Sequence, residues 1–139
     1  MAEPLHAHTI DDAPSAPVGL RVIESSGRGR GLAAARPFRR GEVLERAPVI
    51  LVPRTLLRTL RGSLLDDYWF WWDEQHNACA LGWAALYNHA CPANTRFRLQ
   101  RAARLIVFEA VVDIEAGQEV TINYHGEPDD PRPVWFPAR

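Results

Sequence analysis

Proline and glycine interrupt this chain so often that no long helix or strand fits between them. The 139 residues include 11 prolines and 9 glycines, and each proline fixes φ and removes a backbone donor. The longest apolar runs, such as 47–52 and 78–81, are far shorter than the ~20 residues needed to span a bilayer. We therefore expect short elements joined by irregular turns, and no membrane segment.

Alternating and β-prone residues indicate a mostly β fold. In 95–99 the apolar residues Phe97 and Leu99 alternate with two arginines, as in a strand with one buried face. The chain length suits one domain with a single core. The expected strands are 20–23, 42–52, 68–72, 95–99, 105–112 and 119–124.

One segment follows a helical pattern instead. In 55–65 four leucines fall on one face and two arginines on the other, which predicts an amphipathic helix. A second apolar segment, 81–87, is expected to form a short turn or helix. Residues 1–17 hold three prolines and no apolar periodicity, so we expect a flexible tail followed by a single domain over 18–139.

The basic residues have an unusual composition. All 16 are arginine, and the chain has no lysine. Nine of them lie in 28–61, but they are not interleaved with aromatic residues, so a solvated face is favoured over a nucleic-acid site. Two cysteines do not form a disulfide framework, and the acidic N-terminus does not resemble a secretory signal, which predicts a cytoplasmic protein.

Two pairs of possible metal ligands occur, His76 with Cys79 and His89 with Cys91. They could form a zinc set in principle. The intervening segment 81–87 is too apolar for a zinc finger, so we expect no metal and interpret both cysteines as small buried thiols.

Three further segments have unusual polar or glycine patterns. Gly27, Gly29 and Gly31 alternate, but neither a helix nor a lysine follows, so a nucleotide loop is excluded; a hairpin turn or a backbone passing close to a ligand remains. Segment 88–94 places two asparagines around a histidine, which fits either a surface turn or a set of amides facing a polar ligand. Segment 117–124 is a turn followed by a strand that ends in tyrosine.

In order and spacing, these segments resemble the SET domain, the lysine methyltransferase fold. The similar motifs are Gly29-Arg30-Gly31-Leu32, the turn 37–44, Asn88-His89-Ala90-Cys91-Pro92-Ala93-Asn94, and 113–124 ending in Tyr124. The third motif departs from the family pattern, since Ala90 replaces the usual serine and one spacer residue is absent. The arginine-only, compact chain suits a short stand-alone member, and we expect a bacterial one.

The resemblance implies a SET-like fold of several small curved sheets with short helices and a C-terminal pseudoknot. It implies S-adenosyl-L-methionine as the cofactor and an accessible lysine of a protein or peptide as the substrate. By family role, Tyr124 is catalytic, and Tyr87 and Phe136 belong to the substrate channel. The cofactor-binding residues would be Arg28, Gly29, Arg30, Asn88, His89 and Trp135.

Two other functions stay open at this point. A catalytically silent SET-like module would keep the fold and bind cofactor or a partner protein without turnover, as Ala90 and the altered spacing suggest. An arginine-rich nucleic-acid binder would show salt-dependent binding to DNA. We expect no membrane partner, and self-association into a homodimer is left open.

Overall fold

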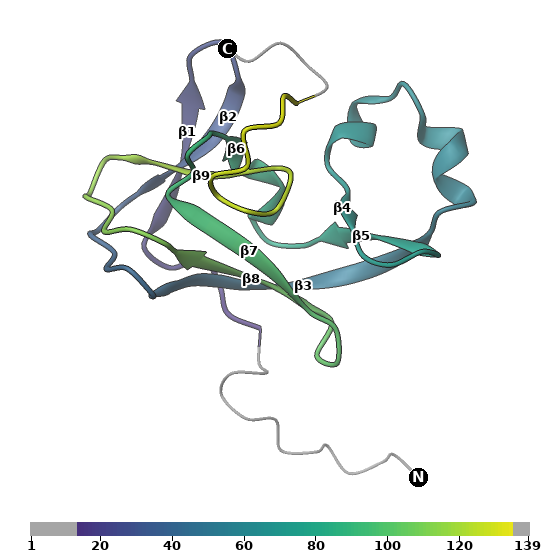
Figure 1. Cartoon of the computed structure of the whole chain (residues 1–139), viewed down its shortest axis with the longest axis horizontal. Coiled ribbons are helices and arrows are strands. Elements are labelled where there is room, and N and C mark those ends of the chain that lie inside the picture. The colour runs from purple at the N-terminus through teal and green to yellow at the C-terminus, as the bar shows by residue number, and fades with distance from the viewer. Residues whose placement is uncertain (1–13, 135–139) are drawn as a thin grey trace, which may run out of the picture.

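The computed structural model describes residues 14–134 and contains two curled β-sheets (Figure 1). One sheet has the strand order β1-β2-β9-β6, and the other has the order β4-β5-β3-β8-β7. The mostly β prediction is therefore confirmed. The strands are β1 Leu20–Ser25, β2 Gly29–Ala34, β3 Val43–Pro53, β4 Phe70–Trp71, β5 His76–Ala80, β6 Asn88–His89, β7 Thr95–Gln100, β8 Leu105–Ala110 and β9 Glu119–Ile122.

The alternating glycines form the turn of the β1–β2 hairpin. The two strands pair from Leu20 opposite Ala34 to Ser25 opposite Gly29. Gly27 and Gly29 have φ values of 72° and 71°, a region that costs glycine little and other residues much more. Of the two interpretations of this motif, the hairpin turn is therefore present.

Strand β9 connects segments that are far apart in the sequence. It pairs antiparallel with β2 on one side and parallel with β6 on the other, with Asn88 opposite Thr121. The chain after β9 then returns to the segment that follows β6, where the Ala93 N–H donates to the Pro128 carbonyl at 2.9 Å. In Figure 1 this returning segment is the yellow loop beside β6 and β9.

The second sheet carries an aromatic face. Phe97 and Phe108 are cross-strand partners on β7 and β8, so their side chains share a face. Phe70 meets both rings edge-on, with centroids 5.2 and 6.1 Å away, and Tyr87 stacks on Phe108 at 4.3 Å. This face forms the wall of the pocket described below.

The predicted helix over 55–65 is wrong. The segment forms two short 3-10 helices, η2 Leu56–Leu60 and η3 Leu64–Asp67, neither with a buried residue. Gly62 separates them with φ 80°, which an α-helix does not accommodate. Leu64 is 85% exposed, so the leucine face has no apolar partner to stabilise a longer helix.

Several smaller expectations also differ from the structure. The strand expected at 68–72 is only Phe70–Trp71, and the strand β5, His76–Ala80, was not among those expected. Neither cysteine is a buried thiol as expected, since Cys91 is exposed and Cys79 is only partly buried. Ser15, assigned to the flexible tail, exchanges hydrogen bonds with Arg46, since its N–H donates to the Arg46 carbonyl and its Oγ accepts from the Arg46 N–H.

The segment 81–87 contains the short 3-10 helix η4, Ala84–Leu86, as the sequence suggested. No helix among residues 14–134 is long and apolar enough to cross a membrane. Trp135 and Phe136 lie outside the described residues.

Candidate functional site

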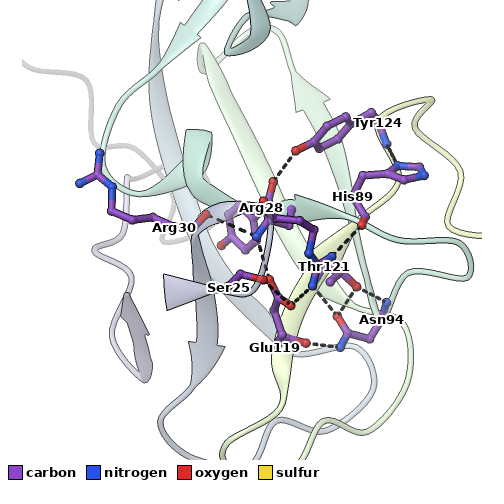
Figure 2. A network of polar contacts seen from close by, with 10 residues as sticks. Ser25, Arg28, Arg30, His89, Asn94, Glu119, Thr121 and Tyr124 are labelled. Atoms are coloured by element: carbon purple, nitrogen blue, oxygen red, sulfur yellow. Dashed lines mark hydrogen bonds and ion pairs between the residues drawn. The ribbon is translucent and has the colours of Figure 1, made fainter. Parts of the chain in front are cut away.

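A polar cluster joins the β1–β2 turn to the edges of β6 and β9 (Figure 2). Glu119 is its centre, because its carboxylate forms an ion pair with Arg28 and accepts a hydrogen bond from Asn88 Nδ2 at 2.8 Å. Arg28 Nη1 also donates to the His89 carbonyl at 3.3 Å. Ser25 Oγ completes the cluster, 3.4 Å from Glu119 Oε2. We call these residues, Ser25, Arg28, Asn88, His89 and Glu119, the polar cluster.

The closeness of Asn88 and Glu119 explains why position 31, the second glycine of the Gly29-x-Gly31 motif, has no side chain. A Cβ atom at this position would lie 2.5 Å from Asn88 Nδ2 and 2.6 Å from Glu119 Oε1. Real Cβ atoms essentially never come this close to a neighbour, so a larger residue at position 31 would force the ends of the Asn88 and Glu119 side chains to move. The carbonyl of the preceding residue, Arg30, accepts from Asn88 Nδ2 at 3.3 Å, while the Arg30 side chain points away (Figure 2).

Tyr124 lies directly beyond β9 and touches both the cluster and the aromatic face. Its backbone N–H donates to His89 Nδ1 at 3.1 Å, and its hydroxyl donates to the Tyr87 carbonyl at 3.1 Å. The rings of His89 and Tyr124 are 5.2 Å apart. Tyr124 is therefore held from two sides, by His89 of β6 and by Tyr87, the residue just before β6.

The Tyr124 ring borders a pocket of about 230 Å³ with an aromatic lining. Six aromatic side chains besides Tyr124 contribute, together with Asp67 at the end of η3 and residues of η4. The aromatic lining residues are Tyr68, Trp69, Phe70, Trp71, Tyr87 and Phe97. The buried indole Nε1 of Trp69 has no hydrogen-bond partner among the described residues, so one donor in the lining is unsatisfied.

Burial shifts the pKa values of the titratable groups around Tyr124. Desolvation raises the pKa of the Tyr124 hydroxyl to about 12, with smaller effects from neighbouring charges. Desolvation, and then His125, lower the pKa of His89. At neutral pH the tyrosine is therefore protonated and the imidazole of His89 is neutral.

Comparison with known proteins identifies the family. The family model of the SET domain matches residues 29–125, which is more than half of the chain. The chain belongs to the SET domain family. A Schizosaccharomyces pombe histone-lysine N-methyltransferase, specific for lysine 37 of H3, is 23% identical over 106 residues, which cover 76% of this chain and 72% of that protein.

The SET fold is also seen in a solved structure, that of a candidate histone methyltransferase from Plasmodium falciparum. The two structures match with a TM-score of 0.58 and 21% identity, over 76% of this chain and 92% of that one. The predicted SET-like architecture is thus confirmed. The expected bacterial origin is not tested by these similarities.

The structure brings most of the predicted SET site residues together. Arg28, Asn88 and His89 lie in the polar cluster, and Tyr124 joins the cluster to the pocket that Tyr87 lines. Gly29 forms the end of the adjoining turn and Arg30 contributes its carbonyl. The roles assigned to these residues stay predictions, and those of Trp135 and Phe136 lie outside the described residues.

Two parts of the site were missed from the sequence. Glu119 was noted only as part of the closing motif, although a charged residue at the start of a strand-forming segment is one that needs a partner if it is buried. The aromatic run 68–72 was interpreted only as a strand. Five consecutive aromatic residues, Tyr68 to Trp72, exceed what one strand can bury on a single face, and that excess is the signal for a pocket.

The possible zinc ligands do not meet. Within residues 14–134, no three histidine, cysteine, aspartate or glutamate side chains form a group that could hold a metal ion. His76 instead contacts Asp73 Oδ1 at 3.0 Å through Nδ1, and Cys91 Sγ donates to the Asp130 carbonyl at 3.2 Å.

Proposed function

We propose that this SET protein transfers a methyl group from S-adenosyl-L-methionine to the side-chain amine of a lysine in a protein substrate. The observation that carries the proposal is the double attachment of Tyr124. Its backbone N–H is bound to His89 in the polar cluster, and its hydroxyl borders the aromatic pocket. One residue therefore adjoins both the proposed cofactor site and the proposed acceptor site.

The polar cluster suits the groups that this cofactor carries. The Arg28 guanidinium would hold a carboxylate, the Glu119 carboxylate would attract an ammonium group, and the Asn88 amide can serve either. A Cβ atom added at Gly29 would meet nothing within 4 Å. The turn therefore leaves open space where a ligand can lie. Since Arg28 now donates to the His89 carbonyl, a ligand that uses this carbonyl would share it with the guanidinium or displace it.

When bound, the cofactor would supply an electrophilic methyl group on a sulfonium. The protein contributes position and environment, which in a transfer without covalent intermediates supply most of the rate. The Tyr124 hydroxyl directs its proton to the Tyr87 carbonyl, so a lone pair of its oxygen can accept from a C–H group of the transferring methyl. With a pKa near 12, this hydroxyl stays protonated and does not act as the base.

The aromatic pocket suits a lysine side chain. Its apolar walls can pack against the four-carbon stem, and ring faces can attract the methylated, cationic product. Lysine has a pKa of about 10.4 in water and must lose a proton before attack. Desolvation between Phe70, Tyr87 and Tyr124 lowers the amine pKa and so favours the reactive neutral form. The walls that bind the stem therefore also promote attack.

The experiment is a two-stage assay on the purified full chain. Isothermal titration calorimetry with S-adenosyl-L-methionine measures binding, and a tritiated cofactor measures transfer to recombinant core histones and to a proteome extract. Histones are included because the Schizosaccharomyces pombe relative is named for a histone lysine. We expect near 1:1 binding and labelled lysine in acid hydrolysates.

Other results would separate the alternatives. Binding without labelled lysine in either substrate supports the catalytically silent module, for which the altered segment 88–94 would be the reason. Absence of cofactor binding would contradict the proposal. Salt-dependent binding to random duplex DNA, with no cofactor binding, would favour a nucleic-acid function.

A further inference from the structure

A buried carboxylate lies beneath the aromatic pocket. Glu45 is only 1% exposed and pairs across the sheet with Phe108. A β-bulge between Val43 and Glu45 shifts the register by one residue, and bulges of this kind re-aim side chains. The bulge turns a charged side chain toward the aromatic face, where an apolar residue would be expected.

Glu45 binds both ends of one short turn. Its Oε1 accepts a hydrogen bond from the Tyr87 hydroxyl at 2.9 Å, and the carboxylate also accepts from the backbone N–H of Trp83. Between them lies η4, which has no side-chain cap of its own. A Cβ at Gly82 would lie 3.0 Å from Glu45 Oε2, so the chain passes close to the carboxylate here as well.

The turn held in this way presents the acceptor for the Tyr124 hydroxyl. That acceptor is the carbonyl of Tyr87, the same residue whose side chain binds Glu45. Ala84, Ala85 and Tyr87 also line the pocket. A shift of the turn would therefore move the Tyr124 hydroxyl and one wall of the pocket together.

We propose that Glu45 is a positioning residue for Tyr124, acting through the 83–87 turn, and that its ionised form is the one that holds the turn in place. This inference rests on the proposed methyl transfer for its effect on rate, but the coupling itself concerns only this chain. Both groups that face the carboxylate are donors, an O–H and an N–H, so the ionised form matches both. Protonation of Glu45 would add the carboxyl O–H as a third donor, facing the O–H of Tyr87 and the N–H of Trp83.

The charge of Glu45 can change near neutral pH. Burial, opposed by the hydrogen bonds from Tyr87 and Trp83, raises the pKa of Glu45 to about 7. On the neighbouring strand β8, Glu109 follows Phe108 and so lies on the face of the sheet opposite the aromatic residues. There it pairs with Arg96 at 2.9 Å. Arg46 follows Glu45 and points to that same opposite face by strand alternation. The aromatic face presents only Tyr87 as a titratable neighbour of Glu45 among the described residues.

The test uses the three tyrosines of the chain. Tyrosine labelled with ¹³C at Cζ gives one signal each for Tyr68, Tyr87 and Tyr124, assigned with phenylalanine variants and followed from pH 5 to 9. We expect the Tyr87 and Tyr124 signals to share a step near pH 7. His89 and His125 lie near Tyr124 and can also move its signal, so the variants decide the source.

Glu45→Gln should remove the shared step, and Tyr87→Phe should remove it from Tyr124 while keeping the ring that stacks on Phe108. Glu109→Gln is the matched control, because it makes the same change on the other face of the neighbouring strand, and it should keep the step. If Glu45→Gln does not fold, Tyr87→Phe breaks the same connection. An unchanged Tyr124 step in either variant, or no step in the wild type, would overturn the proposal.

The rate is measured separately, with tritiated cofactor and core histones as the acceptor. At pH 8 we expect Glu45→Gln to lower kcat about tenfold with little change in the KM of the cofactor, and to lose the rise in kcat through pH 7. Equal pH profiles for Glu45→Gln and wild type would overturn the role in the reaction. If no histone is labelled by the wild type, the proposed function fails in this assay while the tyrosine signals still decide the coupling.

Discussion

Tyr124 and Asn88 lie near each other but are proposed to serve different stages of the methyl transfer. Asn88 donates to Glu119 and to the Arg30 carbonyl, within the cluster proposed to hold the cofactor. The Tyr124 hydroxyl lies on the pocket side and donates to the Tyr87 carbonyl. Contacts to the bound cofactor affect affinity, whereas contacts that strengthen during transfer affect kcat.

We therefore expect Asn88→Ala to weaken S-adenosyl-L-methionine binding at least about tenfold, because it removes an amide from the cluster. Calorimetry measures the dissociation constant, and thermal unfolding of the same sample shows whether the domain is folded. Unchanged affinity in a folded Asn88→Ala protein would remove this residue from the cofactor site.

Tyr124→Phe should leave cofactor affinity within about twofold and lower kcat on the order of a hundredfold, as for other oriented hydroxyls that act in a transition state. Calorimetry and the tritium assay measure the two quantities on one preparation. Full activity in this variant would exclude Tyr124 as a catalytic residue.

At the scale of the elements, the site depends on how closely β2 approaches β6. Gly31 is the point of contact, with no room for a Cβ between β2 and the Asn88 amide. The φ angle of Gly31 is not positive. A larger residue at this position is therefore disfavoured by the Asn88 and Glu119 side chains and not by the backbone conformation. This makes the position a clean steric probe.

Gly31→Ala should separate Asn88 from Glu119 and weaken cofactor binding about tenfold or more, while the hairpin itself still forms. Arg30→Ala is the control on the same strand, since its side chain is exposed and the carbonyl that Asn88 uses remains. Calorimetry on both variants is the measurement. Equal loss of affinity in the two variants would contradict the steric argument.

Whether an element formed as its sequence pattern predicts depended on whether its apolar face found a partner. Strands with clear alternation, such as 95–99, were predicted correctly because each has one buried face. The helix over 55–65 was not, because a leucine face stabilises a helix only when something packs on it, and Leu56 and Leu64 remain 59% and 85% exposed.

The site was predictable only where glycine, asparagine and tyrosine motifs mark it. Residues such as Glu45 and Glu119 gained their importance from partners distant in sequence. Glu45 pairs with Tyr87 and Phe108, and Glu119 with Arg28. Neither pairing follows from local pattern, because the bulge in β3 and the β2–β9 pairing that create them are tertiary features.

At the scale of the whole molecule, the buried Glu45 makes stability depend on pH. A carboxyl group with an ordinary pKa of 4.5 is held at about 7 in the folded protein. The folded state therefore binds more protons than the unfolded chain between these values, so stability falls as the pH rises from about 4.5 to 7 and then levels. The shift corresponds to about 3 kcal/mol.

We expect urea unfolding at pH 5 and pH 8 to show this loss in the wild type and a much smaller one in Glu45→Gln. The difference between the two proteins isolates Glu45, because the lowered pKa of His89 acts in the opposite direction in both. An identical pH dependence in both proteins would show that Glu45 titrates normally.

The absence of lysine affects the whole surface. The only ordinary amine of the chain is the N-terminal one, and guanidinium groups are broader and permanently charged, which makes the 16 arginines poor acceptors. We expect the tag-free protein, incubated alone with labelled cofactor, to gain no methyl group on any side chain. Intact-mass and peptide spectrometry measure this, and a methylated arginine would point to a different acceptor chemistry.

The position of β9 between β2 and β6 also bears on when the site can exist. The Arg28–Glu119 pair spans 91 residues of sequence, and closing so long a loop is entropically costly until most of the chain has collapsed. The proposed cofactor site is consequently among the last parts of the molecule to assemble, after the β1–β2 and β7–β8 hairpins. A growing chain on the ribosome has no such site before β9 emerges, so cofactor binding during refolding marks completion of the fold.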